Sequence, residues 1–337
     1  MALEPPRIAD SIIVEALDKQ YDFSVVALIF LPIGNDPASW VYRAEAGEGR
    51  TLFLKVRAGN GFSTASLRVP YILQQQGLPH VLAPLPARDG TLWISLEDHV
   101  LALYPFIEGQ NGADVGLTND QWQAFGTLVA QIHACRLPHE VLRRTPREAF
   151  VPSRRELMGE LEKVIHRGAF ADDLQQEAAA FWASKQEVIG TLVARADALG
   201  DELRTKRAPD VLCHADMHPW NLLVEEDGTW WLIDWDEVVV ALKERDLMFV
   251  VGGIGGDGVG AEATEVFLEG YGGETVDARA LSYYRTAWAV QDIAAYGEAL
   301  FISPKLSEAS GRAALEGFVS LFATGNIAER ALGQRSE

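Results

Sequence analysis

Three polar side chains suited to phosphate chemistry lie within one short stretch, "HADMHPWNLLVEEDGTWWLIDWD", residues 214 to 236. Asp216 and Asn221 precede two apolar runs, and Asp234 follows them, with "EEDG" between the runs. If the runs pair as an antiparallel hairpin, their outer ends lie about 5 Å apart, so Asn221 and Asp234 meet. An amide oxygen and a carboxylate are the hard oxygen ligands that magnesium takes, together with phosphate and water. The stretch therefore predicts a magnesium–phosphate site.

The remaining carboxylate, Asp216, lies farther along the loop and is free to accept a proton from an attacking hydroxyl. The order of His214, Asp216 and Asn221, with Asp234 after a hairpin, is the H-x-D-x-x-x-x-N arrangement of kinases. Four residue types in this order on these elements predict phosphoryl transfer.

Two other interpretations of this stretch compete. A solvated turn with a capping aspartate and a core histidine explains any one of these residues alone, but explains the set poorly. His214 and His218 have the i, i+4 spacing of a zinc helix, but that mechanism needs a glutamate directly after the first histidine. Ala215 occupies that position and Pro219 ends any helix, which disfavours zinc.

A glycine motif occurs in "GGIGGDG", residues 252–258, where Gly253, Gly255 and Gly258 satisfy G-x-G-x-x-G. A dinucleotide site would need a βαβ unit and an acidic residue about 20 positions later. Glu274 stands near that distance, but the "GGETVDA" around it is turn-like. We expect a loop between helices here.

The first hundred residues are rich in strand-like runs. "SWVYRAEA" and "RTLFLKVR" predict a hairpin joined by "GEG", and further runs follow in "VLAPLPA", "TLWISL" and "VLALYPF". Between them, "STASLRVPYILQQQG" predicts a helix that Pro70 shortens or kinks and that ends at Gly77.

The pattern becomes helical after "YPFIEGQNGADVG", which ends at Gly116. Thr118 and Gln121 predict a capping box, and residues 154–206 favour helix. We therefore expect an α+β bilobal fold, with a β-rich nucleotide-binding lobe over residues 1–106. A mainly helical lobe, catalytic and substrate-binding, is expected over 107–337. Clefts between such lobes commonly bind ligands.

Nucleotide-binding candidates lie in the N-terminal part. Lys55 interrupts an apolar strand, so it is either an edge residue facing solvent or a phosphate ligand. The loop "LPIGNDPAS" contains Gly34 and could place backbone N–H groups over phosphates. Tyr104 precedes the extended segment "PFIEG", which contains Phe106 and whose backbone groups could pair with adenine.

The amino-acid composition indicates which classes of binding partner to expect. With 29 basic against 48 acidic residues, the net charge of −19 disfavours a nucleic-acid or membrane binder and mildly favours a cationic small molecule. Most of these charges are expected to serve solubility alone. Cys135 and Cys213 are the only cysteines, with no CxxC spacing. Without a signal-peptide pattern or an apolar run of about 20 residues, we expect a cytoplasmic protein.

The motifs together resemble the aminoglycoside phosphotransferase family, which has a protein-kinase-like fold, and within it the spectinomycin phosphotransferase type. The resemblance rests on "VYRAEA…FLKVR", "LYPFIEG", "HADMHPWNLLV", "IDWDE", "KERDLMFVVGG" and "YYR…DIAAYG", and covers essentially the whole chain. It implies ATP and Mg²⁺ as cofactors. The roles it implies are Asp216 as catalytic base, Asn221 and Asp234 as magnesium ligands, Lys55 as the α/β-phosphate ligand, His214 as a buttress of the catalytic loop, and Asp246 as hydrogen-bonding support.

The main hypothesis is transfer of the γ-phosphate of ATP to a hydroxyl of a cationic aminocyclitol or aminoglycoside. Carboxylates would hold the ammonium groups of the acceptor, and indole rings would form flat walls or cation–π partners. The candidates are Asp236, Glu237, Asp292, Glu298, Trp235 and Trp288. Ordinary surface and core roles compete for each of them.

One departure from the family pattern supports further hypotheses. Kinase-like folds pair the strand lysine with a glutamate of the next helix, but Thr64 stands where that glutamate would align. No Asp or Glu occurs between Lys55 and Asp89. A nucleotide-binding protein with little catalysis is therefore one alternative. A choline-kinase-like enzyme for a metabolic amino-alcohol or sugar is another.

Overall fold

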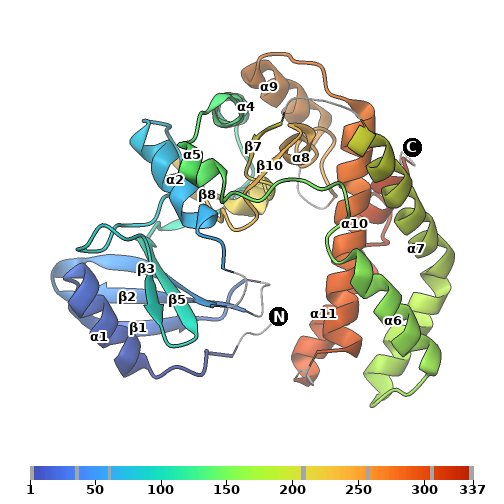
Figure 1. The fold of residues 1–337 in the computed structure, drawn as a ribbon, viewed down its shortest axis with the longest axis horizontal. Helices are drawn as coiled ribbons and strands as arrows, with labels where there is room; N and C mark the ends of the chain where they lie inside the picture. Colours follow the sequence, from blue (N-terminus) through green and yellow to red (C-terminus); the bar gives the residue numbers. More distant parts are fainter. Residues whose placement is uncertain are drawn as a thin grey trace. The chain divides into compact units, whose positions relative to one another are not determined.

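The computed structural model describes residues 4–34, 38–59, 62–205, 210–255, 259–303 and 307–333. The chain forms two compact units (Figure 1). The first unit comprises Ala2–Pro146 and His214–Val239, and the second comprises Arg147–Cys213 and Val240–Glu337. Because the chain leaves and re-enters the first unit, this division differs from the expected lobes. The lobe boundary at residue 106 remains a proposal.

The first unit contains a five-stranded antiparallel sheet in the order β1-β2-β3-β5-β4. Its strands are β1 (Val25–Leu31), β2 (Ser39–Ala46), β3 (Thr51–Ala58), β4 (Ile94–Leu96) and β5 (His99–Pro105). The predicted hairpin is confirmed, since β2 and β3 pair and "GEG" forms a 3-10 turn, Gly47–Gly49. "VLAPLPA" was wrongly expected to be a strand, because only Val81 bridges a strand there. Its prolines lack the N–H that a ladder needs.

Side chains along β3 point alternately to the two faces of the sheet. Leu54 and Val56 are fully buried in a core that includes Ile13 and Leu17 of α1 (Asp10–Tyr21). Figure 1 shows α1 lying along the sheet. Because successive side chains point to opposite faces, Lys55 lies on the other face.

The helix after β3, α2 (Ala65–Gln75), has the expected short length and contains Pro70. It ends as predicted at Gly77, whose φ is +84°, with the Leu78 N–H donating to the Leu73 carbonyl at 3.1 Å. Glycine adopts this left-handed conformation without a Cβ penalty.

A second, three-stranded sheet of the first unit carries the chemistry-bearing hairpin. Its order is β6-β8-β9, with β6 (Gly109–Asn111), β8 (Leu222–Glu225) and β9 (Trp230–Leu232). The 3-10 turn η2 (Pro219–Asn221) leads into β8, and the helices of this region are α3 (Gly112–Val115), α4 (Asn119–Ala134) and α5 (His139–Leu142). The predicted capping box of Thr118 and Gln121 begins α4.

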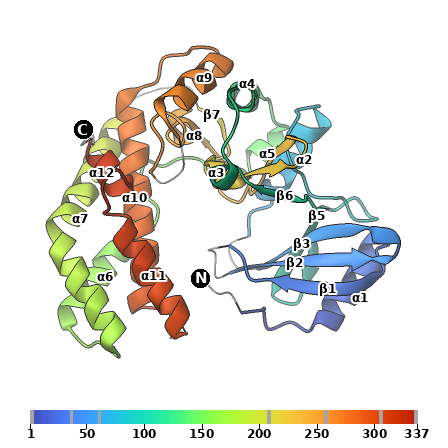
Figure 2. The ribbon, with the colours of Figure 1, turned by 180° about the vertical axis from the view of Figure 1, so that it is seen from behind.

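The second unit is mainly helical. It contains α6 (Arg155–Arg167), α7 (Asp173–Thr205), α8 (Glu244–Leu247), α9 (Ala261–Tyr271), α10 (Ala278–Phe301), α11 (Glu308–Ser320) and α12 (Ile327–Leu332), with β7 (Val211–Cys213) paired to β10 (Val239–Ala241). Helix α10 contacts α6, α7, α11 and α12. Figure 2 shows α12 beside α10. Among the described residues, no helix has the length and apolarity needed to cross a membrane.

The glycine motif precedes α9 and follows α8, so this part of the chain connects two helices as expected. Gly253 and Gly255 lie in that loop, with φ of +61° and +99°. Gly258 lies outside the described residues.

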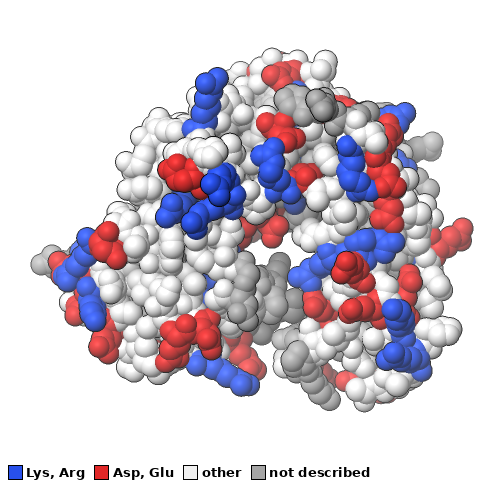
Figure 3. Space-filling view, in the orientation of Figure 1, with Lys and Arg blue, Asp and Glu red and all other residues white. Residues whose placement is uncertain are grey.

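Charged side chains of both signs cover the surface of the second unit. Ion pairs join Arg155 to Asp197 and Arg312 to Glu177, at 2.8 and 2.7 Å. Acidic and basic groups are interspersed on the face drawn in Figure 3. The expectation that most of the acidic residues serve solubility stays a prediction.

Candidate active site

The hairpin brings Asn221 beside the residue that precedes Asp234. Leu222 pairs with Leu232, and the Ile233 N–H donates to the Asn221 carbonyl oxygen at 3.0 Å. The predicted antiparallel pairing is therefore confirmed, and both metal-ligand candidates stand at its open end.

His214 connects the two ends of this loop from within the core. Its ring is fully buried, with Nε2 2.9 Å from the Ile233 carbonyl oxygen and Nδ1 accepting from the Asp216 N–H at 3.2 Å. These partners assign the proton to Nε2. The Trp235 ring packs edge-on against His214, with centroids 4.6 Å apart. His214 thus contacts both ends of the loop, and its buttressing role stays a prediction.

Both oxygens of the Asp216 carboxylate have partners. Asn221 Nδ2 donates to Oδ2 at 2.8 Å, and His218 Nε2 lies 3.0 Å from Oδ1. Burial lowers the pKa of His218, but the Asp216 charge and hydrogen bond outweigh it and raise the pKa above its usual value. The sequence suggested only a zinc role for His218, so its pairing with Asp216 was not predicted. Its position two residues after Asp216 could have indicated this pairing.

Lys55 lies among carboxylates of the hairpin exit. Its Nζ donates to Asp234 Oδ1 at 2.9 Å and to Asp236 Oδ2 at 2.7 Å. Arg57, two residues along β3, pairs with Asp236 Oδ1 at 2.7 Å. The structure thus brings the phosphate-ligand candidate together with a metal-ligand candidate that is 179 residues away.

The charged groups in this cluster shift one another's pKa values. Burial opposes the charge on Lys55, but Asp234 and Asp236 raise its pKa well above the usual range. Burial alone would raise the pKa of Asp234, but the Lys55 ammonium outweighs burial and lowers this pKa to about 2. Burial and the neighbouring Asp234 charge raise the pKa of Asp236. Asp234 is therefore an ionised carboxylate at neutral pH.

Two residues of the site have a left-handed backbone conformation that non-glycine residues rarely adopt. The φ angles of Ala215 and Asp234 are +71° and +60°. Such conformations cost about 1–3 kcal/mol each and concentrate at functional sites.

The donor set fits magnesium. The Asn221 amide nitrogen is engaged by Asp216, at 2.8 Å from its backbone oxygen as well as from its carboxylate, which leaves the amide oxygen for a cation. The Asp234 carboxylate already accepts one cation, the Lys55 ammonium. One amide oxygen and one carboxylate, completed by water and phosphate, match the preference of Mg²⁺.

The aromatic nucleotide-binding candidates lie toward the same sheet face as Lys55. Tyr104 is opposite Phe53, and their rings meet edge-to-face at 6.3 Å. The Arg43 guanidinium lies 4.9 Å from the centre of the Phe106 ring. Gly34 follows β1 with a φ of +92°. Their nucleotide-binding role stays a prediction.

Three acceptor candidates belong to the first unit. Trp235 is only 3% exposed, so this placement offers an acceptor no face of its ring. Both oxygens of Asp236 are paired with protein cations. Glu237 is exposed.

The other three acceptor candidates lie on α10 of the second unit. The Arg245 guanidinium sits 5.1 Å from the Trp288 ring, so this indole already has a cation partner. Glu298 pairs with Arg154. Asp292 is half-buried. Acceptor binding by any of the six candidates stays a prediction.

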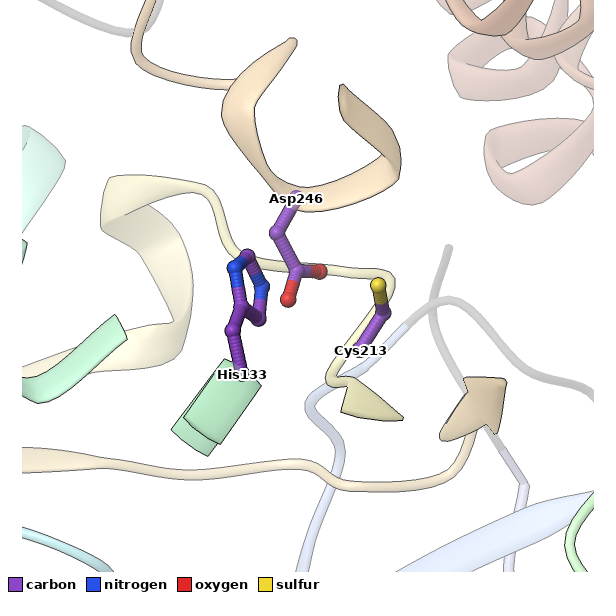
Figure 4. Close-up of side chains that lie close together, drawn as sticks. All are labelled: His133, Cys213 and Asp246. Atoms are coloured by element: carbon purple, nitrogen blue, oxygen red, sulfur yellow. The ribbon is translucent and has the colours of Figure 1, made fainter. Parts of the chain in front are cut away.

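Asp246 is a buried residue of α8, at 1% exposure. Figure 4 shows it near Cys213, which ends β7. Burial and then the Asp246 charge raise the pKa of the Cys213 thiol, which therefore stays neutral. The expected supporting role of Asp246 toward the catalytic loop stays a prediction.

A strand lysine paired with an aspartate at the end of a hairpin, and an asparagine at the start of that hairpin bonded to a second aspartate, is the arrangement of kinase-like phosphotransferases. Residues 31–284 match the model of the phosphotransferase enzyme family, and the chain belongs to this family. The predicted family, the α+β protein-kinase-like fold and the enzyme class, a phosphotransferase acting on a hydroxyl, are confirmed.

Solved structures and one sequence relative give further likenesses. The structure is similar to spectinomycin phosphotransferase APH(9)-Ia in complex with ADP and spectinomycin, at 29% identity and a TM-score of 0.86, covering 98% of this chain and 99% of that one. Amicoumacin kinase hAmiN, in complex with AMP-PNP, Ca²⁺ and Ami, shares the fold at 18% identity and a TM-score of 0.66, covering 96% and 94%. Protein StrN of Streptomyces griseus is 28% identical over 118 residues, 35% of each chain.

Proposed function

We propose that this phosphotransferase transfers the γ-phosphate of ATP to a hydroxyl of a cationic aminocyclitol or aminoglycoside, with spectinomycin as the first candidate. The observation that carries the proposal is the cluster of Lys55, Asp216, Asn221 and Asp234 within one compact unit. Whole-length similarity to a spectinomycin phosphotransferase supports the choice of acceptor.

The residues of the cluster divide into a base, a phosphate ligand and two metal ligands. Asp216, aimed by Asn221 and His214, accepts the proton of the acceptor hydroxyl. Lys55 binds nucleotide phosphates. Asn221 and Asp234 would hold Mg²⁺, which would neutralise phosphate charge when bound. Transfer of this kind depends mainly on positioning and charge stabilisation, and the short hydrogen bonds of the cluster hold the reacting groups in place.

The acceptor's ammonium groups are expected to pair with carboxylates. Glu237 is the exposed candidate of the first unit, and Asp292 and Glu298 are candidates of the second unit. The large excess of acidic residues favours a cationic acceptor in general terms.

The test is a coupled assay of purified protein with ATP or GTP and Mg²⁺. The panel contains spectinomycin, other aminoglycosides, choline and small sugars, with mass spectrometry of the product. The expected result is one added phosphoryl group and the highest kcat/KM for spectinomycin. Preference for choline or a sugar would instead indicate a metabolic small-molecule kinase. Nucleotide consumption at background with every acceptor would indicate a nucleotide-binding protein with little catalysis.

A further inference from the structure

The partner of Lys55 does not come from the helix that follows its strand. The sheet-facing side of α2 is apolar: Leu67, only 3% exposed, packs with Ala102, and Tyr71 and Tyr104 pack against them. Ala102 is directly opposite Lys55 in the sheet. No acidic residue occurs in α2, whose sequence is "ASLRVPYILQQ". A lysine that must bind phosphate in one geometry therefore needs an anchor from another element.

Asp236 occupies the position of such an anchor. One carboxylate oxygen accepts from Lys55 and the other from Arg57, both at 2.7 Å. Lys55 and Arg57 are two residues apart on β3, so their side chains leave the same face of the sheet. The Asp236 side chain is 21% exposed, against 41% for Asp234. Asp236 is therefore the more enclosed of the two partners of Lys55.

We propose that Asp236, braced by Arg57, is the residue that positions Lys55, in place of the helix glutamate that this chain lacks. This inference rests on the proposed function. Asp234 is the second partner of Lys55, and its carboxylate is also the proposed metal ligand. Asp236 would hold Lys55 in place while Asp234 holds Mg²⁺.

The residue between the two carboxylates is anchored in the core. Trp235 is 3% exposed and packs against His214, so it fixes the segment that carries Asp234 and Asp236. A carboxylate with two cation partners is also more constrained than one with a single partner. The same contacts make Asp236 a poor ligand for an acceptor ammonium, because both of its oxygens are engaged.

Kinetics separate the positioning role from acceptor binding. Asp236→Asn keeps the shape and removes the charge. It should lower kcat for the best acceptor by about 10- to 100-fold, since small misplacements have effects of this size. The acceptor KM should stay within about twofold, because the residue does not touch the acceptor. Asp236→Glu should restore part of kcat. Glu226→Gln, which removes an exposed charge in the same hairpin, is the matched control and should match the wild type.

A second measurement needs neither metal nor acceptor. Lys55 acylation by an amine-reactive reagent in EDTA, without nucleotide, is followed by peptide mass spectrometry. Lys55 should react slowly in the wild type and about tenfold faster in Asp236→Asn, because an amine that has lost a 2.7 Å ion-pair partner is more accessible to the reagent. Arg57→Met should act in the same direction. The double variant should add little to Asp236→Asn, because both changes break one network.

Two outcomes would overturn the inference. Unchanged Lys55 acylation in Asp236→Asn and Arg57→Met would show that the contact does not hold the lysine. An acceptor KM raised about tenfold with kcat kept would make Asp236 an acceptor ligand. If no acceptor is phosphorylated by the wild type, the proposed function fails, but the acylation rates still decide how Lys55 is held. If Asp236→Asn does not fold, Asp236→Glu and Arg57→Met provide the same comparison.

Discussion

Asn221 holds Asp216 at two points, because its Nδ2 donates to the Asp216 backbone oxygen and to carboxylate Oδ2, each at 2.8 Å. One amide group thus fixes both the backbone and the side chain of the proposed base. The same amide presents its oxygen for a cation. The orientation of the Asp216 carboxylate and the proposed binding of metal therefore depend on a single side chain.

Asn221→Asp should damage both properties at once. The new carboxylate cannot donate to Asp216 and adds a like charge beside it. We expect kcat to fall by about 10²- to 10³-fold, in the range found when a positioned catalytic group is disturbed. The Mg²⁺ concentration for half-maximal rate should also change. Steady-state rates over a magnesium titration measure both, with Gln123→Glu on the exposed side of α4 as control. A variant with unchanged kcat and magnesium response would contradict the assignment of Asn221.

His214→Leu should destabilise the fold. Its removal leaves the Ile233 carbonyl and the Asp216 N–H without their present partner in a buried place. Each such group costs about 1–3 kcal/mol, so we expect the free energy of unfolding to fall by about 2–4 kcal/mol. Urea denaturation measures this, and His139→Leu at an exposed position should change stability by less than about 0.5 kcal/mol. Equal stability of the two variants would refute the buttressing role.

The His218–Asp216 pair should make stability depend on pH. Because the pKa of His218 is raised in the folded state, its contribution is fully present below the unfolded value of about 6.5. It is lost as the pH rises through the folded value. Relative to His218→Asn, the wild type should therefore lose free energy of unfolding above about pH 6.5. Urea denaturation at several pH values in EDTA provides the comparison. Curves that run parallel for the two proteins would count against the pairing.

Two glycines of α7 should respond oppositely to alanine. A Cβ at Gly200 would overlap the Phe150 backbone carbonyl oxygen, whereas a Cβ at Gly190 meets nothing within 4 Å. Gly200→Ala should cost about 1–3 kcal/mol through overpacking. Gly190→Ala should gain up to about 1 kcal/mol from helix propensity. Thermal or urea unfolding gives both values, and a stable Gly200→Ala variant would mean that α7 packs differently.

Local patterns in the sequence predicted the elements that depend on neighbouring residues. The capping box of Thr118, the helix end at Gly77 and the hairpin around Gly228 all rest on side chains a few positions apart. "VLAPLPA" was misjudged because apolar composition outweighed its two prolines. Neither α1 nor β1 was expected, although α1 provides much of the core under the sheet.

Contacts between distant residues were the part that no local pattern could indicate. The absence of a helix glutamate for Lys55 is visible in the sequence, but its partner Asp236 is 181 residues away. Arg57 drew no attention, because an arginine at a strand end is ordinary until its partner is known. His218 was weighed for the wrong chemistry because spacing alone matched a zinc motif.

In the proposed mechanism, phosphoryl transfer depends most directly on Asp216. The decisive measurement compares Asp216→Asn with the wild type for product formation per enzyme and for ATP affinity. The account predicts a fall in kcat of about 10²- to 10⁴-fold, the usual contribution of a general base, with the Kd for ATP within about twofold. An Asp216→Asn enzyme that keeps most of its turnover would contradict it.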